Sequence, residues 1–324
     1  MLRKLSLSLL IAAVPLGAEA ARAAQIYVSN ERDNTVTVLD SETLQIIKVI
    51  ATGRRPRGIV ITPDYKEVIV CIGDDNRLDV IDTEKLEVVR TYDASGPDPE
   101  LLAVDRKGDR IYVANEDDGL VTVLDRASGK ALAEVPVGVE PEGMGVSPDG
   151  GIVVNTSEQT SMAHFINTKT FEVVANVLVD TRPRVAEFTL DGREAWVSAE
   201  VGGTVSIIDA KTFQILYKLT FDISGVRPEL VQPIGVRFTL DGKTAFVALG
   251  PSNRIAVIDV ATHKIKDYIL VGQRPWHIAL KPDGTKLYAA NGLTNDMTVI
   301  DVTTLKAEKT VQVGRLPWGI AIKP

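Results

Sequence analysis

The sequence predicts an all-β fold, a seven-bladed β-propeller, on three observations. A proline recurs seven times, at intervals of 42 or 43 residues apart from one interval of 50. Two β-rich segments recur with it, one resembling YVSN or YVAN and one of the form V-x-V-(I/L)-D. Repeats of about 40–50 residues that each hold four short strands are typical of propeller blades. The repeated prolines are Pro56, Pro99, Pro141, Pro183, Pro233, Pro275 and Pro317.

Each part of the repeat has a local reason to form a strand or a turn. Runs such as 36–39 (VTVL) and 255–258 (IAVI) are rich in β-branched residues, and no run shows a sustained helical period. The Asp that closes V-x-V-(I/L)-D is followed by small polar residues, so it is expected to close a turn by bonding to backbone N–H groups. The Pro-Asp-Gly segments are typical of turns as well.

The phase of the repeat predicts how the ring closes. After the N-terminal leader, the chain enters at the second strand of a blade, near Ile26, and it ends on an innermost strand at 318–322. The C-terminal strand is therefore expected to pair with the N-terminal blade. Such closure removes the exposed strand edges of an open array.

The first 24 residues have the features of a signal peptide. Arg3 and Lys4 precede an apolar run at 5–16, and small residues follow it, with cleavage expected after Ala20, Ala23 or Ala24. The run is too short for a membrane span, which needs about 20 residues. We expect residues 1–24 to be removed and residues 25–324 to form the propeller, a monomer in the periplasm without a membrane span.

Composition excludes several classes of function. The 324 residues carry a formal charge of −7, which becomes −9 without residues 1–24, and this argues against binding nucleic acid. Cys71 is the sole cysteine, which excludes an intramolecular disulfide, a thiolate zinc site and C-x-x-C-H haem attachment. We therefore predict no cofactor, no resident metal and no catalytic residue set, although calcium at an acidic sector stays open.

The residues that follow the repeated prolines are expected to converge on the mouth of the central channel. Arginines flank an acidic sector there, which could hold Ca²⁺ or form a solvated face balanced by arginine. The two tryptophans could stack on a planar ligand or partner, or cap the core beneath the mouth. The predicted funnel-face residues are Arg57, Glu100, Glu142, Arg184, Trp276, His277 and Trp318.

The interval of 50 residues marks an insertion in the fifth repeat. It lies at 221–233, on the predicted funnel face, and supplies Arg227, Glu229 and Gln232 as further binding candidates. An irregular loop added to a regular scaffold is a common place for function, although a drifted surface loop would look the same.

The repeated YVSN-like and V-x-V-(I/L)-D segments resemble the YVTN family of β-propeller repeats over the whole of 25–324. Together with the leader and the insertion, they are similar to a subgroup associated with alcohol catabolism by dehydrogenases that depend on pyrroloquinoline quinone (PQQ). That resemblance implies a non-enzymatic binding or scaffold protein. Its implied partners are a quinoprotein dehydrogenase, a cytochrome c or a transport component.

An enzyme is the alternative. Some seven-bladed propellers are lactonases or lactone-forming isomerases that use His, Glu and Arg in the channel. In this chain His277 would act as base, Glu142 as acid and Arg184 as oxyanion clamp. A structural histidine satisfied by its neighbours is the plainer interpretation of His277.

Overall fold

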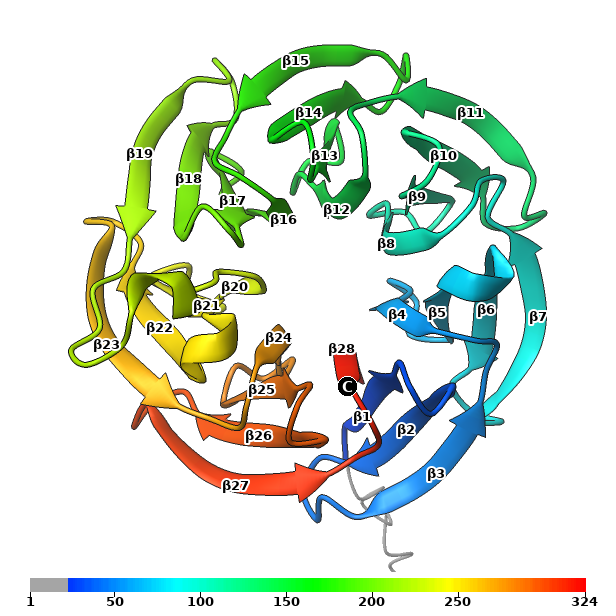
Figure 1. Cartoon of the computed structure of the whole chain (residues 1–324). Coiled ribbons are helices and arrows are strands. Elements are labelled where there is room, and N and C mark those ends of the chain that lie inside the picture. The colour runs from blue at the N-terminus through cyan, green and yellow to red at the C-terminus, as the bar shows by residue number, and fades with distance from the viewer. Residues whose placement is uncertain (1–22) are drawn as a thin grey trace, which may run out of the picture.

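A computed structural model describes residues 23–324, so residues 1–22 of the expected leader, with the cleavage position after Ala20, lie outside the described residues. Within 23–324 the chain forms seven four-stranded antiparallel sheets arranged as blades around a central channel (Figure 1). The predicted seven-bladed β-propeller is therefore confirmed. The described residues contain three 3₁₀ turns, no α-helix and no helix long and apolar enough to cross a membrane.

The strands occupy four concentric positions. The innermost strands are β4 (Pro56–Ile61), β8 (Pro99–Val104), β12 (Pro141–Val146), β16 (Pro183–Phe188), β20 (Val236–Phe238), β24 (Pro275–Leu280) and β28 (Pro317–Lys323). The second strands are β1 (Gln25–Asn30), β5 (Glu67–Ile72), β9 (Arg110–Asn115), β13 (Ile152–Ser157), β17 (Glu194–Ala199), β21 (Thr244–Ala248) and β25 (Lys286–Asn291). The third strands are β2 (Thr35–Asp40), β6 (Arg77–Asp82), β10 (Leu120–Asp125), β14 (Met162–Asn167), β18 (Thr204–Asp209), β22 (Arg254–Asp259) and β26 (Asp296–Asp301). The outermost strands are β3 (Ile46–Ala51), β7 (Glu87–Asp93), β11 (Ala131–Pro136), β15 (Val173–Leu178), β19 (Ile215–Thr220), β23 (Lys264–Leu270) and β27 (Lys306–Gln312).

The last strand closes the ring as predicted. Strand β28 pairs antiparallel with β1, in register from Gln25↔Lys323 to Val28↔Ile320, and completes the blade of β1, β2 and β3. Because β28 covers the inner edge of β1, that edge is not left unpaired.

The core consists of apolar layers between neighbouring blades. One layer joins Val36 and Val38 of β2 to Ile59 of β4 and Val70 of β5, and all four side chains are at most 7% exposed. Small residues let the inner strands approach closely. A Cβ added at Gly235 would lie 2.8 Å from the Trp276 carbonyl oxygen, so any larger residue there would push two blades apart.

The repeated polar residues have structural partners. The Asp40 carboxylate accepts hydrogen bonds from the backbone N–H groups of Glu42 and Thr43, at 2.9 and 2.8 Å, which confirms its role in the turn. The side chain of Asn30, at the end of β1, bonds to a neighbouring strand instead of to the backbone of a turn. Its side-chain amide donates to the Thr37 hydroxyl of β2 at 2.9 Å, which fixes the two strands to each other.

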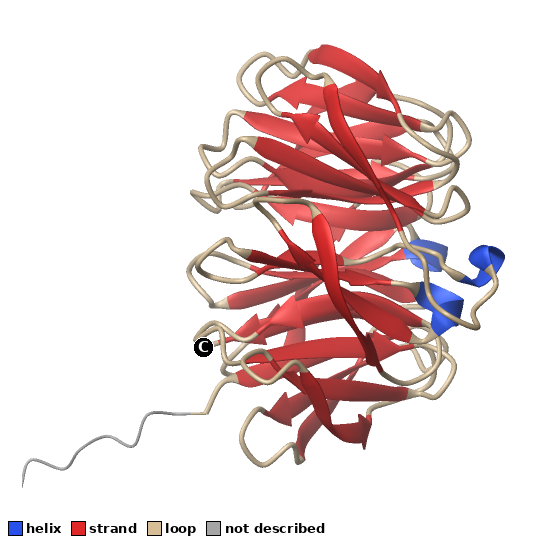
Figure 2. Ribbon diagram, turned by 90° about the vertical axis from the view of Figure 1, so that its left-hand side faces the viewer, coloured by secondary structure: helices blue, strands red, loops and turns tan. Residues whose placement is uncertain are grey.

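All three 3₁₀ turns lie on one face of the disc, and the C-terminus lies at the opposite face (Figure 2). The turns are η1 (Gly73–Asp75), η2 (Pro228–Leu230) and η3 (Gly250–Ser252). Turn η2 belongs to the insertion at 221–233, which projects from this face. We call it the funnel face, because the innermost strands begin there.

Candidate functional site

The backbone before each innermost strand directs charged side chains toward the channel mouth. Six of the seven residues that precede a repeated proline have a positive φ, and only Gln232 of the insertion departs from this. A left-handed conformation is costly for residues other than glycine, so the surrounding blade must hold it in place. The six are Arg55 (φ 62°), Asp98 (51°), Glu140 (57°), Arg182 (60°), Arg274 (55°) and Leu316 (53°).

Two arginines of the blade that begins with β4 clamp one carboxylate of the next blade. Arg55 lies 2.6 Å from Glu100, and Arg57 forms a second ion pair with the other oxygen of the same carboxylate. Arg55 also pairs with Asp98. Glu100 is completely buried, so these arginines supply the charge that stabilises its ionised form.

Arg184 is the centre of a second group of ion pairs. Its guanidinium lies 2.7 Å from Glu142 and 3.7 Å from Glu200, and it pairs with Glu158 as well. Arg184, Glu142, Glu158 and Glu200 are all at most 4% exposed. We call the ion-paired residues of these two groups the mouth network.

The arginine-balanced acidic sector is thus present, but it is buried rather than solvated. The reason is that three neighbouring blades each add a carboxylate from the loop after the second strand, which pairs with arginines beside the repeated prolines. Glu116, Glu158 and Glu200 each follow directly after a second strand, β9, β13 and β17, and they meet the arginines that follow or precede the repeated prolines. Glu158 and Glu200 are not among the residues that the sequence predicted for the site. Their shared position after the second strand was the signal that could have found them.

The carboxylates of the mouth network differ in their proton affinity. Burial alone would raise the pKa of Glu100, but the charges of Arg57 and Arg55 outweigh it and hold that pKa below its usual value. Burial, a hydrogen bond with Glu100 and the negative charges of Glu100 and Asp98 raise the pKa of Glu116 to about 8. Burial also raises the pKa of Glu142.

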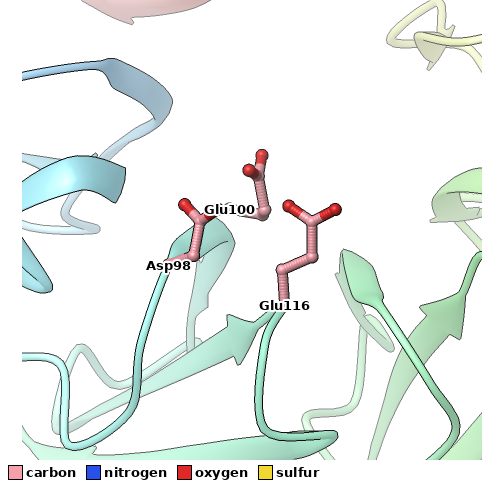
Figure 3. A group of neighbouring side chains, drawn as sticks. All are labelled: Asp98, Glu100 and Glu116. Atoms are coloured by element: carbon pink, nitrogen blue, oxygen red, sulfur yellow. The ribbon is translucent and has the colours of Figure 1, made fainter.

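Figure 3 shows one of two groups of three neighbouring carboxylates, Asp98, Glu100 and Glu116; the other is Glu116, Glu140 and Glu158. One oxygen from each lies within 4.8 Å of the others, a spacing at which a cation could be held. However, Arg55 already pairs with Asp98 and Glu100, and calcium prefers six to eight oxygen ligands. Guanidinium groups therefore already neutralise Asp98 and Glu100.

The two tryptophans of the funnel lie beside arginines of the mouth network. The Trp276 ring centroid is 4.4 Å from the Arg274 guanidinium carbon and 5.7 Å from that of Arg184. Arg57 lies 4.8 Å from the Trp318 ring. Trp318 is 1% exposed, which places its indole in the core beneath the mouth, whereas Trp276 is half-buried.

His277 does not join the mouth network. It lies one residue further along β24, where its ring is 4.1 Å from that of Trp318, and it forms no hydrogen bond with any residue of 23–324. Burial and the positive charges of Arg237, Arg184 and Arg57 lower its pKa well below the usual value. Glu142 and Arg184 are thus paired with each other, while His277 stands apart from both.

The insertion residues are also separate from the mouth network. Arg227 and Glu229 are exposed, and Gln232 is half-buried and donates a hydrogen bond to the Glu229 carbonyl at 3.2 Å. No ion pair within the described chain links them to the charged groups at the channel mouth. The structure therefore separates the insertion residues, which we call the exposed rim, from the buried mouth network and from the channel residues His277 and Trp318.

Fold and site define a seven-bladed propeller with a network of ion pairs at its channel mouth. The profile of the choice-of-anchor I domain family matches residues 72–284, about two thirds of the chain, and the protein belongs to that family. The profile of the YNCE-like beta-propeller matches residues 1–91. Among curated proteins no significant match is found.

Solved structures with the same fold are distant in sequence. Hydrazine synthase of Kuenenia stuttgartiensis is 21% identical with a TM-score of 0.79, over 86% of this chain and 92% of that chain. A functionally unknown protein of Desulfotomaculum acetoxidans is 17% identical with a TM-score of 0.79, over 92% and 98%. The periplasmic gluconolactonase of Pseudomonas aeruginosa is 17% identical with a TM-score of 0.77, over 93% and 99%. At these identities the likeness shows the fold alone.

Proposed function

We propose that the protein is a non-enzymatic binding propeller, exported to the periplasm, that serves as an accessory to PQQ-dependent alcohol oxidation. Its partner would be a quinoprotein dehydrogenase, a cytochrome c or a component of the associated transport system. The observation that carries the proposal is the pairing of the channel-mouth charges with one another. Groups that are buried and ion-paired are poorly placed to transfer protons to a substrate. They instead hold the loops of the channel mouth in fixed positions, which gives a partner a rigid face to bind.

The insertion supplies the part of this surface that a partner can reach. Ile223 and Val231 are buried in the core of the adjoining blade, while Arg227 and Glu229 remain exposed on the funnel face. An anchored loop loses little conformational freedom on association, so its exposed side chains can contribute to affinity at low entropic cost.

The proposal is tested by capture from periplasmic extract of alcohol-grown cells, with residues 25–324 immobilised and bound proteins identified by mass spectrometry. We expect a quinoprotein dehydrogenase, its cytochrome or a transport component, and we expect the Arg227→Ala/Glu229→Ala variant to lose it. The matched control is Asp191→Ala/Arg193→Ala, which removes an exposed acid and an exposed arginine from a turn between β16 and β17. Capture that the insertion variant does not change, or capture of none of these proteins, contradicts the proposal.

A lactonase is the second candidate, favoured by one observation at the mouth. Glu116 is 20% exposed and holds its proton up to a pH of about 8, which is the property of a general acid. The fold likeness to a gluconolactonase agrees with this candidate. The test is the rate of gluconolactone opening in a pH-stat: saturable hydrolysis that is lost in Glu116→Gln would assign an enzyme, and a rate equal to that of buffer would remove it.

A further inference from the structure

A cavity of about 250 Å³ lies inside the channel, beneath the mouth network. It extends from Trp318 and His277 to Pro63, which follows β4 toward the face opposite the funnel. At about 30 Å³ per molecule in the liquid, this volume equals that of roughly eight waters. It is large enough for a compact organic molecule.

The walls of the cavity are mostly apolar. Ile59, Leu102, Met144 and Ile320 come from four different innermost strands, and each is at most 8% exposed. A hydrocarbon group that covers these apolar side chains removes them from water and so gains free energy.

Two polar groups in the wall have no hydrogen-bond partner within residues 23–324, the imidazole of His277 and the indole N–H of Trp318. His277 is 8% exposed, lines the cavity and forms no hydrogen bond with any residue of 23–324. Its low pKa keeps the imidazole neutral, with one nitrogen as donor and the other as acceptor. A buried polar group usually has a hydrogen-bond partner, and the cavity is where His277 can find one.

The remaining charges of the cavity balance each other. The Arg237 guanidinium donates a hydrogen bond to Glu187 at 2.6 Å, so neither charge is left without its counterpart. A cationic occupant would meet the positive charges that lower the pKa of His277, and an anionic occupant would find each of these arginines already paired with a carboxylate. The lining therefore selects for a molecule without net charge.

We propose that this cavity binds a small uncharged molecule that carries a hydroxyl or carbonyl oxygen on a compact hydrocarbon. The oxygen bonds to His277, and the hydrocarbon lies among the apolar side chains of the innermost strands. This site is separate from the exposed rim. Binding in this cavity does not depend on a protein partner at the funnel face.

The experiment uses the Met144 methyl group as a reporter. Residues 25–324 are labelled with ¹³C-methyl methionine, and benzyl alcohol, toluene, benzoate and benzylammonium are titrated to millimolar concentration. We expect benzyl alcohol and, more weakly, toluene to shift the Met144 resonance, while the two ions do not. Met162, which is half-buried on β14, and Met297, which is buried on β26, should stay unchanged. No Met144 shift with benzyl alcohol, or equal shifts with the ions, overturns the proposal.

Two variants assign the site. His277→Phe keeps an aromatic ring beside Trp318 but removes the hydrogen bond, so benzyl alcohol should bind about tenfold more weakly and toluene equally well. The matched control is His263→Phe, in the turn between β22 and β23, which should bind both as the parent chain does. Ala103→Leu fills the cavity and should abolish binding of both molecules. A folded Ala103→Leu protein that still binds benzyl alcohol contradicts the cavity as the site.

Discussion

Glu116 shows how a single residue of the mouth network responds to its neighbours. Its carboxyl shares a hydrogen bond with Glu100 and lies 3.9 Å from Arg55, yet that arginine is already engaged by Asp98 and Glu100. The arginine charge therefore does not offset the repulsion from the two ionised neighbours. Glu116 is protonated at neutral pH, and its proton joins two carboxyl groups that would otherwise repel each other.

This proton makes stability depend on pH. The pKa of Glu116 is raised from 4.5 to about 8, so the folded state binds the proton more tightly than the unfolded state does. Its contribution is fully present below about pH 4.5 and is lost as pH rises through about 8. Glu116→Gln mimics the protonated form. We expect its melting temperature to match the parent at pH 5 and to exceed it at pH 8.5, measured by circular dichroism. Equal melting temperatures for the parent chain and the variant at pH 8.5 would contradict this assignment.

At the scale of the element, the insertion is a loop anchored in the core of the adjoining blade. Ile223 is 7% exposed and Val231 is 4% exposed, and both pack with Val236 and Phe238 of the adjoining innermost strand. The polar residues between them stay on the surface. The eight or so extra residues are thus attached to the blade at two apolar points instead of hanging free.

Removing one of these points should loosen the loop and weaken the blade. Ile223→Ala deletes buried methyl groups, and we expect it to lower the free energy of unfolding by about 2–4 kcal/mol. Leu216→Ala on β19 of the neighbouring blade is the control: Leu216 is 54% exposed, and the expected loss is below about 0.5 kcal/mol. Urea denaturation compares the two. Equal losses would mean that the insertion packs no more tightly than an exposed side chain.

At the scale of the whole molecule, the ring depends on the strand that closes it. Strand β28 brings Trp318, Ile320 and Ile322 into the core, and each is at most 6% exposed. It also covers the inner edge of β1. Without it, this blade would lose its innermost strand and expose an unpaired edge to other molecules.

A chain that ends at Leu316 tests this dependence. Loss of three buried side chains, each worth about 1.5–3 kcal/mol, should lower the melting temperature by about 10 °C or more. The exposed β1 edge should also cause association, visible by light scattering after size exclusion. A chain that lacks only Pro324, which lies outside β28, is the control. A shortened chain that stays monomeric with an unchanged melting temperature would show that closure adds little.

The sequence predicted the fold well because the blade is a local repeat. Each proline, strand end and turn recurs at the same phase, and Asp40 and its equivalents form the expected turns. The candidate site was harder to predict, because it depends on contacts between blades. Glu158 and Glu200 were missed since their partner Arg184 enters from other loops, and the burial of Trp318 depends on what packs above it. The cavity beneath depends on side-chain size in several blades at once.

The pairing of β28 with β1 has a mechanical consequence. The register places Gln25 opposite Lys323, so the chain enters and leaves this pair of strands at the same end. Tension applied between Gln25 and Lys323 would break the hydrogen bonds between β1 and β28 one after another, starting from that end, instead of loading all of them at once. Under load the ring would therefore open at its seam before any blade stretches, and the seam sets the force that the molecule can bear.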